Sequence, residues 1–344
     1  MNSTSRPDGF RDAFIKNFIA VFLCVAINTI NGSFIYIYFR SEVFKKDPRY
    51  VLYIHLVIND IIMLTGSVLL QVITYLAVGG INVALCCTIL VVMVTTNKNS
   101  PVNLACMAVE RYIAVCRPLH HPQLCTVGRT YCLIGLIWGA SFIDAFADII
   151  IIFVTRPLSF FSVSMMCFAD AIFSVRQHKD KTSVVQVVLV SMVFLTLVIT
   201  YLKVLFAARK ASGDDQVSAR KARNTILLHG VQLLICMLSY ASPILTMHLI
   251  RSFPTNFRNI LFPCFLLTNV LPRLLSPLIY GVRDQKFSSQ LRLLFSCRSS
   301  GPGEGERLKP TAGERVRPMK GKRETQTVGE RGSSKKMNKQ TGRP

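Results

Sequence analysis

The chain has 344 residues, of which 51% are hydrophobic and 17% are charged, and its mean hydropathy is +0.41. This fraction of charged residues is too small to cover the surface of a soluble protein of this length. The composition therefore indicates an integral membrane protein. The formal net charge of +22 would suggest a nucleic-acid partner for a soluble chain. Basic residues also orient membrane proteins, and we therefore expect no nucleic-acid partner.

Seven apolar segments follow one another along the chain, and each suits a helix that crosses a bilayer. They lie at about 17–39, 51–77, 83–115, 131–154, 184–208, 225–250 and 258–281. A helix needs roughly 20 residues to cross the hydrocarbon core. The sequence therefore predicts an all-α membrane protein, with a seven-transmembrane helix bundle at residues 14–283 after an extracellular segment at 1–13.

The basic residues of the predicted loops give the orientation. With the N-terminus outside, eleven Lys and Arg residues fall in the inner loops and six in the outer loops. This excess predicts a multi-pass protein of the plasma membrane, with an extracellular N-terminus and a cytoplasmic C-terminus. Asn2, which opens an Asn-Ser-Thr triplet, is a candidate glycosylation site and agrees with that orientation.

Two different segments follow the last span. Residues 284–297 repeat apolar side chains at helical spacing between basic ones, which predicts an amphipathic helix on the inner membrane surface, in contact with lipids. Cys297 is a candidate for palmitoylation, although an unmodified thiol fits equally well. Residues 298–344 contain almost nothing apolar, and from residue 299 onwards 12 Lys and Arg minus five Glu give a charge of +7. We expect a disordered basic cytoplasmic tail that anionic lipids attract.

A long motif stands at the inner end of the third span, where residues 107–119 read MAVERYIAVCRPL. It resembles the MAxERYxAxCxPL signature of odorant receptors, within the rhodopsin-like family of G-protein-coupled receptors. LVIND at 56–60, KARNT at 221–225 and PRLLSPLIYG at 272–281 agree, and the last is similar to fish odorant receptors in particular. The chain departs from the NPxxY motif of the seventh span by carrying Ser276 instead of Asn.

The resemblance, which covers roughly residues 14–296, implies a receptor that binds a small odorant and activates an olfactory or stimulatory G protein. It implies a switch at the inner ends of the helices, formed by Glu110, Arg111, Tyr112, Tyr201 and Tyr280.

The resemblance also implies a disulfide between the third span and the loop after the fourth. Cys86 lies 25 positions before Arg111, as in the family, and Cys167 is its implied partner. Cys87 is the competing candidate for the disulfide with Cys167, but the family spacing favours Cys86.

Two charged residues within predicted spans are candidates for an internal ion pair. A charge at bilayer depth is costly, faces the bundle interior and needs a partner. The family's packing would place Arg273 beside Asp60, and we expect the pair to take the place of a sodium ion. The alternative is that each residue finds water or backbone partners separately.

Other polar residues within the spans are candidates for ligand binding. Val94, Asn97 and Lys98 map to the wall that relatives use for ligand, and Asp144 and Asp148 lie one helical turn apart on what is expected to be the adjacent wall. A purely structural bridge between Lys98 and Asp144 is the alternative. Both interpretations hold if that bridge forms the floor of the pocket.

Other classes of protein fit the sequence less well. A transporter would show inverted repeats and broken half-helices, which are not evident. An enzyme is not expected, since no HExxH, GxSxG or catalytic acid pair appears, and no His/Cys cluster has the spacing of a metal or cofactor site. His120, His121 and His229 are isolated in the sequence and are interpreted as structural. A non-olfactory rhodopsin-like receptor for another small ligand remains the alternative, because fold does not fix the ligand.

Overall fold

The structure is a computed structural model, and it describes residues 9–77, 80–165, 167, 172–173, 175–211, 249, 252, 257–283, 287–290 and 292. The side chains at 208–211, 257–259 and 280–283 are not included. Asn2, Cys297, the tail from 298 and nearly all of the predicted sixth span therefore lie outside the described residues. The chain divides into two units, Met1–Ser299 and Ser300–Pro344, and the helices belong to the first.

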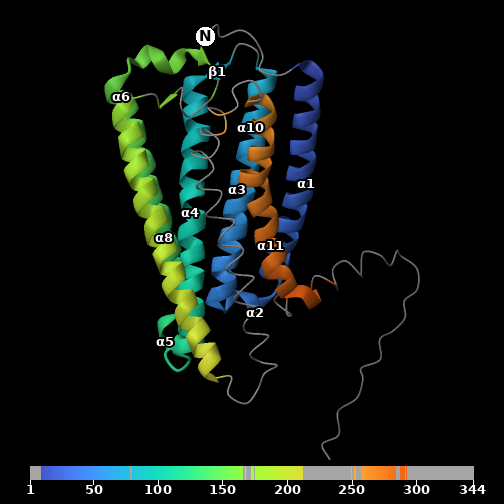
Figure 1. Ribbon diagram of the computed structural model, residues 1–344, viewed down its shortest axis with the longest axis vertical. Coiled ribbons are helices and arrows are strands. Elements are labelled where there is room, and N and C mark those ends of the chain that lie inside the picture. The colour runs from blue at the N-terminus through green and yellow to red at the C-terminus, as the bar shows by residue number, and fades with distance from the viewer. Residues whose placement is uncertain are drawn as a thin grey trace, which may run out of the picture. The chain divides into compact units, whose positions relative to one another are not determined.

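Long helices run side by side in this first unit (Figure 1). In chain order the elements are α1 (Phe10–Arg40), α2 (Glu42–Lys45), α3 (Pro48–Leu76), β1 (Ile81–Asn82), α4 (Val83–Cys116), α5 (His121–Leu124), α6 (Val127–Thr155), the 3-10 helix η1 (Leu158–Ser162), β2 (Ser164–Met165), α8 (Arg176–Ala211), α10 (Phe257–Phe265), the π-helix η3 (Leu266–Val270) and α11 (Leu271–Arg283). The described part of the chain holds six stretches long and apolar enough to cross a membrane. They correspond to the predicted spans other than the sixth, and the α-helical bundle is confirmed.

Side-chain caps fix where three of the helices begin. Asp47 and Asn82 each accept a hydrogen bond from the amide two residues further on, at 3.0 and 2.9 Å, and Thr126 accepts one from the amide three residues further on, at 3.4 Å. Such caps satisfy amides that have no partner within the helix. Burial raises the pKa of Asp47, but its hydrogen bonds with Arg49 outweigh burial and hold the pKa below its ordinary value.

Two helices begin about two turns earlier than the apolar pattern predicts. α1 starts at Phe10 and α8 at Arg176, whereas the spans were expected from 17 and 184. The reason is that hydropathy marks only the part of a helix that lipid surrounds, while backbone hydrogen bonds continue into polar turns. For α8 the difference matters, because the added turns carry His178 and Lys181.

An aromatic cluster lies at the end of the bundle where α1, α2 and α3 meet. The Phe287 ring, which is 1% exposed, lies 4.4 Å from the ring of Phe44, 5.3 Å from Tyr50, 5.7 Å from Tyr53 and 5.8 Å from Phe34, between centroids. Residues 287–290 are helical, as expected for this segment. Phe287 itself packs into the protein instead of facing lipid, because neighbouring rings enclose it.

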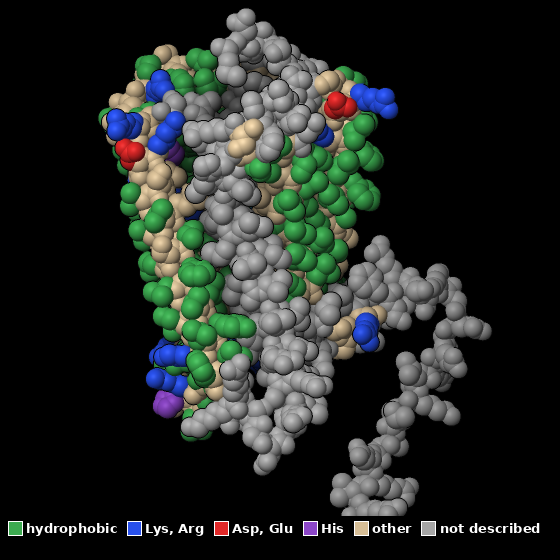
Figure 2. Space-filling model, viewed as in Figure 1, with side chains coloured by type: hydrophobic (Ala, Val, Ile, Leu, Met, Phe, Trp, Pro, Cys, Tyr) green, Lys and Arg blue, Asp and Glu red, His purple; other side chains and the backbone are tan. Residues whose placement is uncertain are grey.

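Large hydrophobic side chains cover the outer flanks of the bundle. They are exposed on the helices at its sides, and Figure 2 shows them along α8 and α1. Phe18 and Phe22 on α1 are both 64% exposed, and Phe194 on α8 is 59% exposed. An apolar surface of this extent suits contact with lipid and not with water.

Candidate functional site

A disulfide closes the loop between α6 and α8 onto the start of α4. Cys86 and Cys167 are bonded, with their Cα atoms 5.7 Å apart, and Cys87 is a free thiol. The predicted pairing is thus confirmed. Beside it, β1 and β2 pair antiparallel, with Ile81 opposite Met165. Gly80 precedes this pair at φ +82°, where a Cβ would lie 2.5 Å from the Met165 backbone.

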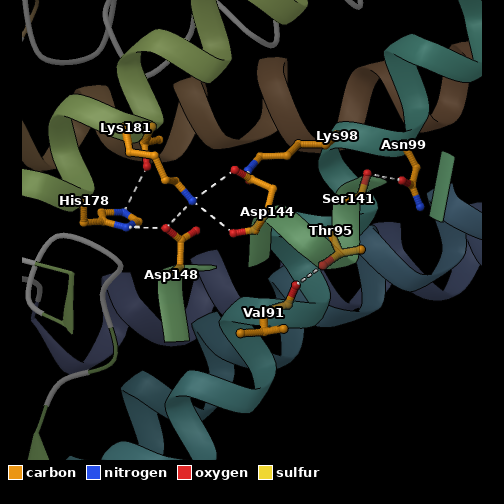
Figure 3. A network of polar contacts seen from close by, with 10 residues as sticks. Val91, Thr95, Lys98, Asn99, Ser141, Asp144, Asp148, His178 and Lys181 are labelled. Atoms are coloured by element: carbon orange, nitrogen blue, oxygen red, sulfur yellow. Dashed lines mark hydrogen bonds and ion pairs between the residues drawn. The ribbon is translucent and has the colours of Figure 1, made fainter. Parts of the chain in front are cut away.

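A charged network joins α4, α6 and α8 (Figure 3). Lys98 of α4 forms an ion pair with Asp144 of α6. Lys181 of α8 reaches both acids, with its Nζ 3.0 Å from Asp144 Oδ1 and 2.5 Å from Asp148 Oδ1. His178 Nδ1 lies 2.7 Å from the same Asp148 oxygen. Two lysines thus face two carboxylates, so that the formal charges of these four side chains balance.

His178 has two further contacts, one at its second ring nitrogen and one on the face of its ring. Its Nε2 lies 3.2 Å from the Thr182 hydroxyl, and the Phe173 ring stacks on it at 4.5 Å between centroids. The side chains of the network are only partly exposed, from 5% for Asp148 to 23% for Lys181. Charges so far from bulk water interact strongly, so that the network fixes the mutual positions of three helices.

The sequence predicts only part of this network. It proposed Lys98, Asp144 and Asp148, while Val94 and Asn97 lie half-buried on α4 within about one turn of Lys98. Lys181 is one of the six basic residues that were expected in the outer loops, and His178 was not among the predicted site residues. The available signal was their spacing of three residues, which matches one helix face. That spacing places His178 and Lys181 on one helix face because α8 starts at Arg176, before its apolar stretch.

A second polar chain lies deeper, between α3, α4 and α6. Ser141 donates a hydrogen bond to Asn99 at 2.7 Å, and the Trp138 indole N–H donates to His55 Nε2 at 2.9 Å. His55 Nε2 also lies 3.2 Å from the Asn59 amide. Trp138 is the single tryptophan of the chain. Interhelical hydrogen bonds of this kind replace the hydrophobic driving force that is missing within a membrane.

Asp60 and Arg273 meet in the interior, as predicted. Arg273 Nε lies 3.8 Å from Asp60 Oδ1, and Arg273 Nη1 donates to the Thr268 carbonyl at 3.1 Å. Ser276 is a polar neighbour of Asp60. The contact joins α3 to α11. That the pair substitutes for a sodium ion stays a prediction.

The expected switch residues gather at the opposite end of α4 from the disulfide. Glu110 is buried, and its carboxylate lies 2.8 Å from His121 Nε2 of α5. His121, which is isolated in the sequence and was interpreted as structural, meets Glu110 because α5 folds back against α4. Lys203 of α8 lies over the Tyr112 ring, 5.5 Å from its centroid.

Arg111 and Tyr201 are half-buried near this end, and no hydrogen bond between the two is present among the described residues. The Tyr280 side chain lies outside the description. The role of the five residues as a switch stays a prediction.

The chain is similar to known receptors over most of its length. Residues 30–280 match the family described as 7 transmembrane receptor (rhodopsin family). The chain is 30% identical over 303 residues to Odorant receptor 131-2 of Danio rerio, which covers 86% of this chain and 92% of that protein. It is 27% identical over 207 residues to Olfactory receptor 4N5 of Homo sapiens, covering 56% of this chain and 61% of that protein. It is 26% identical over 296 residues to Olfactory receptor 2Y1 of Homo sapiens, covering 83% of this chain and 91% of that protein.

These matches confirm the resemblance to odorant receptors, fish receptors included. Proteins of the matched family are receptors and not enzymes. The chain belongs to the rhodopsin family of seven-transmembrane receptors, within its odorant-receptor branch.

Proposed function

We propose that this protein is an odorant receptor, which binds a small chemical ligand in the half of the bundle near the disulfide and activates a heterotrimeric G protein at the other end. The G protein is of the olfactory or stimulatory type. The receptor lies in the plasma membrane with its N-terminus extracellular, so that the Glu110–Tyr112 segment faces the cytoplasm.

The proposal rests mainly on two functional groups that lie on one continuous helix. Lys98 belongs to the charged network, and Arg111 belongs to the acid–Arg–Tyr motif, and both lie on α4. Thirteen residues of helix separate them by about 20 Å. A ligand that shifts α4 relative to α6 or α8 at one end therefore changes the surroundings of Arg111 at the other.

The network suits a ligand-sensitive contact between helices. Each lysine faces a carboxylate across a helix boundary, and the side chains are not fully enclosed, with exposures from 5% to 23%. A polar ligand group that replaces one of these partners alters the spacing of α4, α6 and α8. Ligand binding then shifts the population of receptor conformations towards the one that G protein recognises.

The test is a cyclic AMP assay in cells that express the full-length receptor with a stimulatory olfactory Gα subunit. A panel of odorants and amino acids supplies the candidate ligands, and an N-terminal epitope stained on intact cells measures both surface level and orientation. We expect at least one ligand to raise cyclic AMP. Arg111→Ala should abolish the response at unchanged surface level, because it removes the centre of the switch. A full response from Arg111→Ala would refute the proposed mechanism.

A further inference from the structure

An apolar crevice opens between α6 and α8, with α4 as its floor. Its volume is about 440 Å³, within the roughly 300–1,000 Å³ typical of small-molecule sites. Ala105 of α4 and Val193 of α8 are buried lining residues, at 8% and 4% exposure. Leu133 of α6 and Met192 of α8 stand at the mouth, at 36% and 65% exposure. Both flanking helices are candidate membrane spans, so the mouth faces lipid.

One end of the crevice is polar and holds its two charged lining residues. Glu110 and Arg129 line it there. The Glu110 carboxylate lies beside His121, whereas Arg129 is exposed and forms no ion pair with any described residue. Arg129 Nη1 donates to the backbone carbonyls of Gln123 and Leu124 at 2.7 and 3.4 Å, which fixes the guanidinium at the crevice and leaves other N–H groups for a ligand.

A further cation stands at the same end of the bundle. Lys203 is exposed, and its carbonyl oxygen lies 3.8 Å from Cys116 Sγ at the end of α4. Figure 2 shows Lys and Arg side chains at this end of α8, below a band of hydrophobic side chains. A ligand for this crevice thus needs an apolar part that lies in the membrane and an anionic part at its surface.

We propose that the crevice binds one anionic glycerophospholipid, with an acyl chain between α6 and α8 and the phosphate at Arg129. An acyl chain gains little hydrophobic free energy on leaving other lipid, because lipid tails are as apolar as the crevice. Selectivity therefore depends on the headgroup charge at Arg129 and on packing within the crevice. A sterol would fill the apolar part but has no anionic group for Arg129.

The site has a consequence for signalling, because Val109 and Glu110 also line the crevice and directly precede Arg111. A lipid seated on them contacts α4, α6 and α8 at once. It therefore restrains their spacing beside the acid–Arg–Tyr segment. This site is separate from the charged network, which lies towards the disulfide.

The test is native mass spectrometry of the purified full-length receptor in detergent, titrated with phosphatidylserine, phosphatidylcholine or cholesterol. We expect one phosphatidylserine to be retained in preference to the other two. Arg129→Gln should weaken its retention about fivefold, the loss of one cation near a membrane surface, and Arg129→Lys should restore most of it. Met192→Trp should also weaken retention by filling the mouth. The matched control is Leu195→Trp, since Leu195 is 60% exposed on the same helix and does not line the crevice.

Four results would overturn the proposal. They are equal retention of phosphatidylserine and phosphatidylcholine, retention of cholesterol alone, unchanged retention after Arg129→Gln, and displacement of the lipid by inorganic phosphate. The last would mark Arg129 as a simple anion site. Each variant's thermal unfolding temperature is measured in parallel, so that loss of the lipid is not confused with loss of the fold.

Discussion

Arg273 of α11 directs its Nε to within 3.8 Å of Asp60 Oδ1 on α3, and each of the two side chains is only 5% exposed. These helices lie far apart in the sequence, at Pro48–Leu76 and Leu271–Arg283. An isolated charge at this depth would cost roughly 2.5–3.5 kcal/mol on membrane-insertion scales. In the pair, each charge offsets part of the free-energy cost of burying the other. Asp60 therefore has a cationic partner within the protein.

The first prediction is that Asp60 and Arg273 are energetically coupled. Asp60→Asn or Arg273→Gln alone should destabilise the receptor by about 3–5 kcal/mol, because the remaining charge stays buried without a partner. The double variant should lose less than the sum of the two. A double-mutant cycle on thermal unfolding of the purified receptor measures the coupling. Additive losses would contradict it, and so would a strong dependence of wild-type ligand affinity on sodium concentration.

The second prediction concerns the disulfide between Cys86 and Cys167. Cys167→Ser should destabilise the receptor by about 2–4 kcal/mol, because the loop before α8 is no longer tied to α4. It should also weaken the response to ligand, since that loop lies beside the charged network. Cys87→Ser is the control, because Cys87 is the adjacent free thiol. Equal effects of the two substitutions on unfolding temperature and response would disprove the assignment.

The third prediction concerns the network that Lys181 completes. Lys181→Gln leaves Lys98 beside Asp144 and His178 beside Asp148, but removes the one cation that contacts both acids, so that their like-charge repulsion is less fully offset. We expect a loss of about 3–5 kcal/mol in stability, as for a broken buried pair. Lys179→Gln is the matched control, because Lys179 is exposed two residues away. Thermal unfolding compares the two, and an identical small shift would mean that Lys181 contributes no net stability.

The fourth prediction concerns Phe287, which joins the segment after α11 to the aromatic cluster. Phe287→Ala should cost about 3–5 kcal/mol, the usual range for removing a buried ring. Phe194→Ala on the lipid-facing side of α8 is the control and should change stability little in a membrane-like environment. The measurement is unfolding temperature in lipid nanodiscs together with surface expression in cells. A Phe287 variant as stable as the control would show that the cluster does not depend on this ring.

The sequence by itself determined the class of the protein, the course of most spans and the motif at the end of the third. These properties depend on local composition and on continuous stretches of residues. A run of apolar residues at bilayer length must form a helix, because lipid offers no other partners to backbone N–H and C=O groups. The motif MAVERYIAVCRPL is contiguous, so it is readable without any knowledge of the fold.

Only the tertiary structure decided which polar residues meet. His178 and Lys181 join Asp144 and Asp148 because α8 continues for two polar turns beyond its apolar stretch, which hydropathy does not register. His121 reaches Glu110 because α5 folds back on α4. The crevice beside Arg129 exists because α6 and α8 both pack on α4 and leave a space between them. Each of these contacts depends on the rotation and length of whole helices, and packing between distant segments sets both.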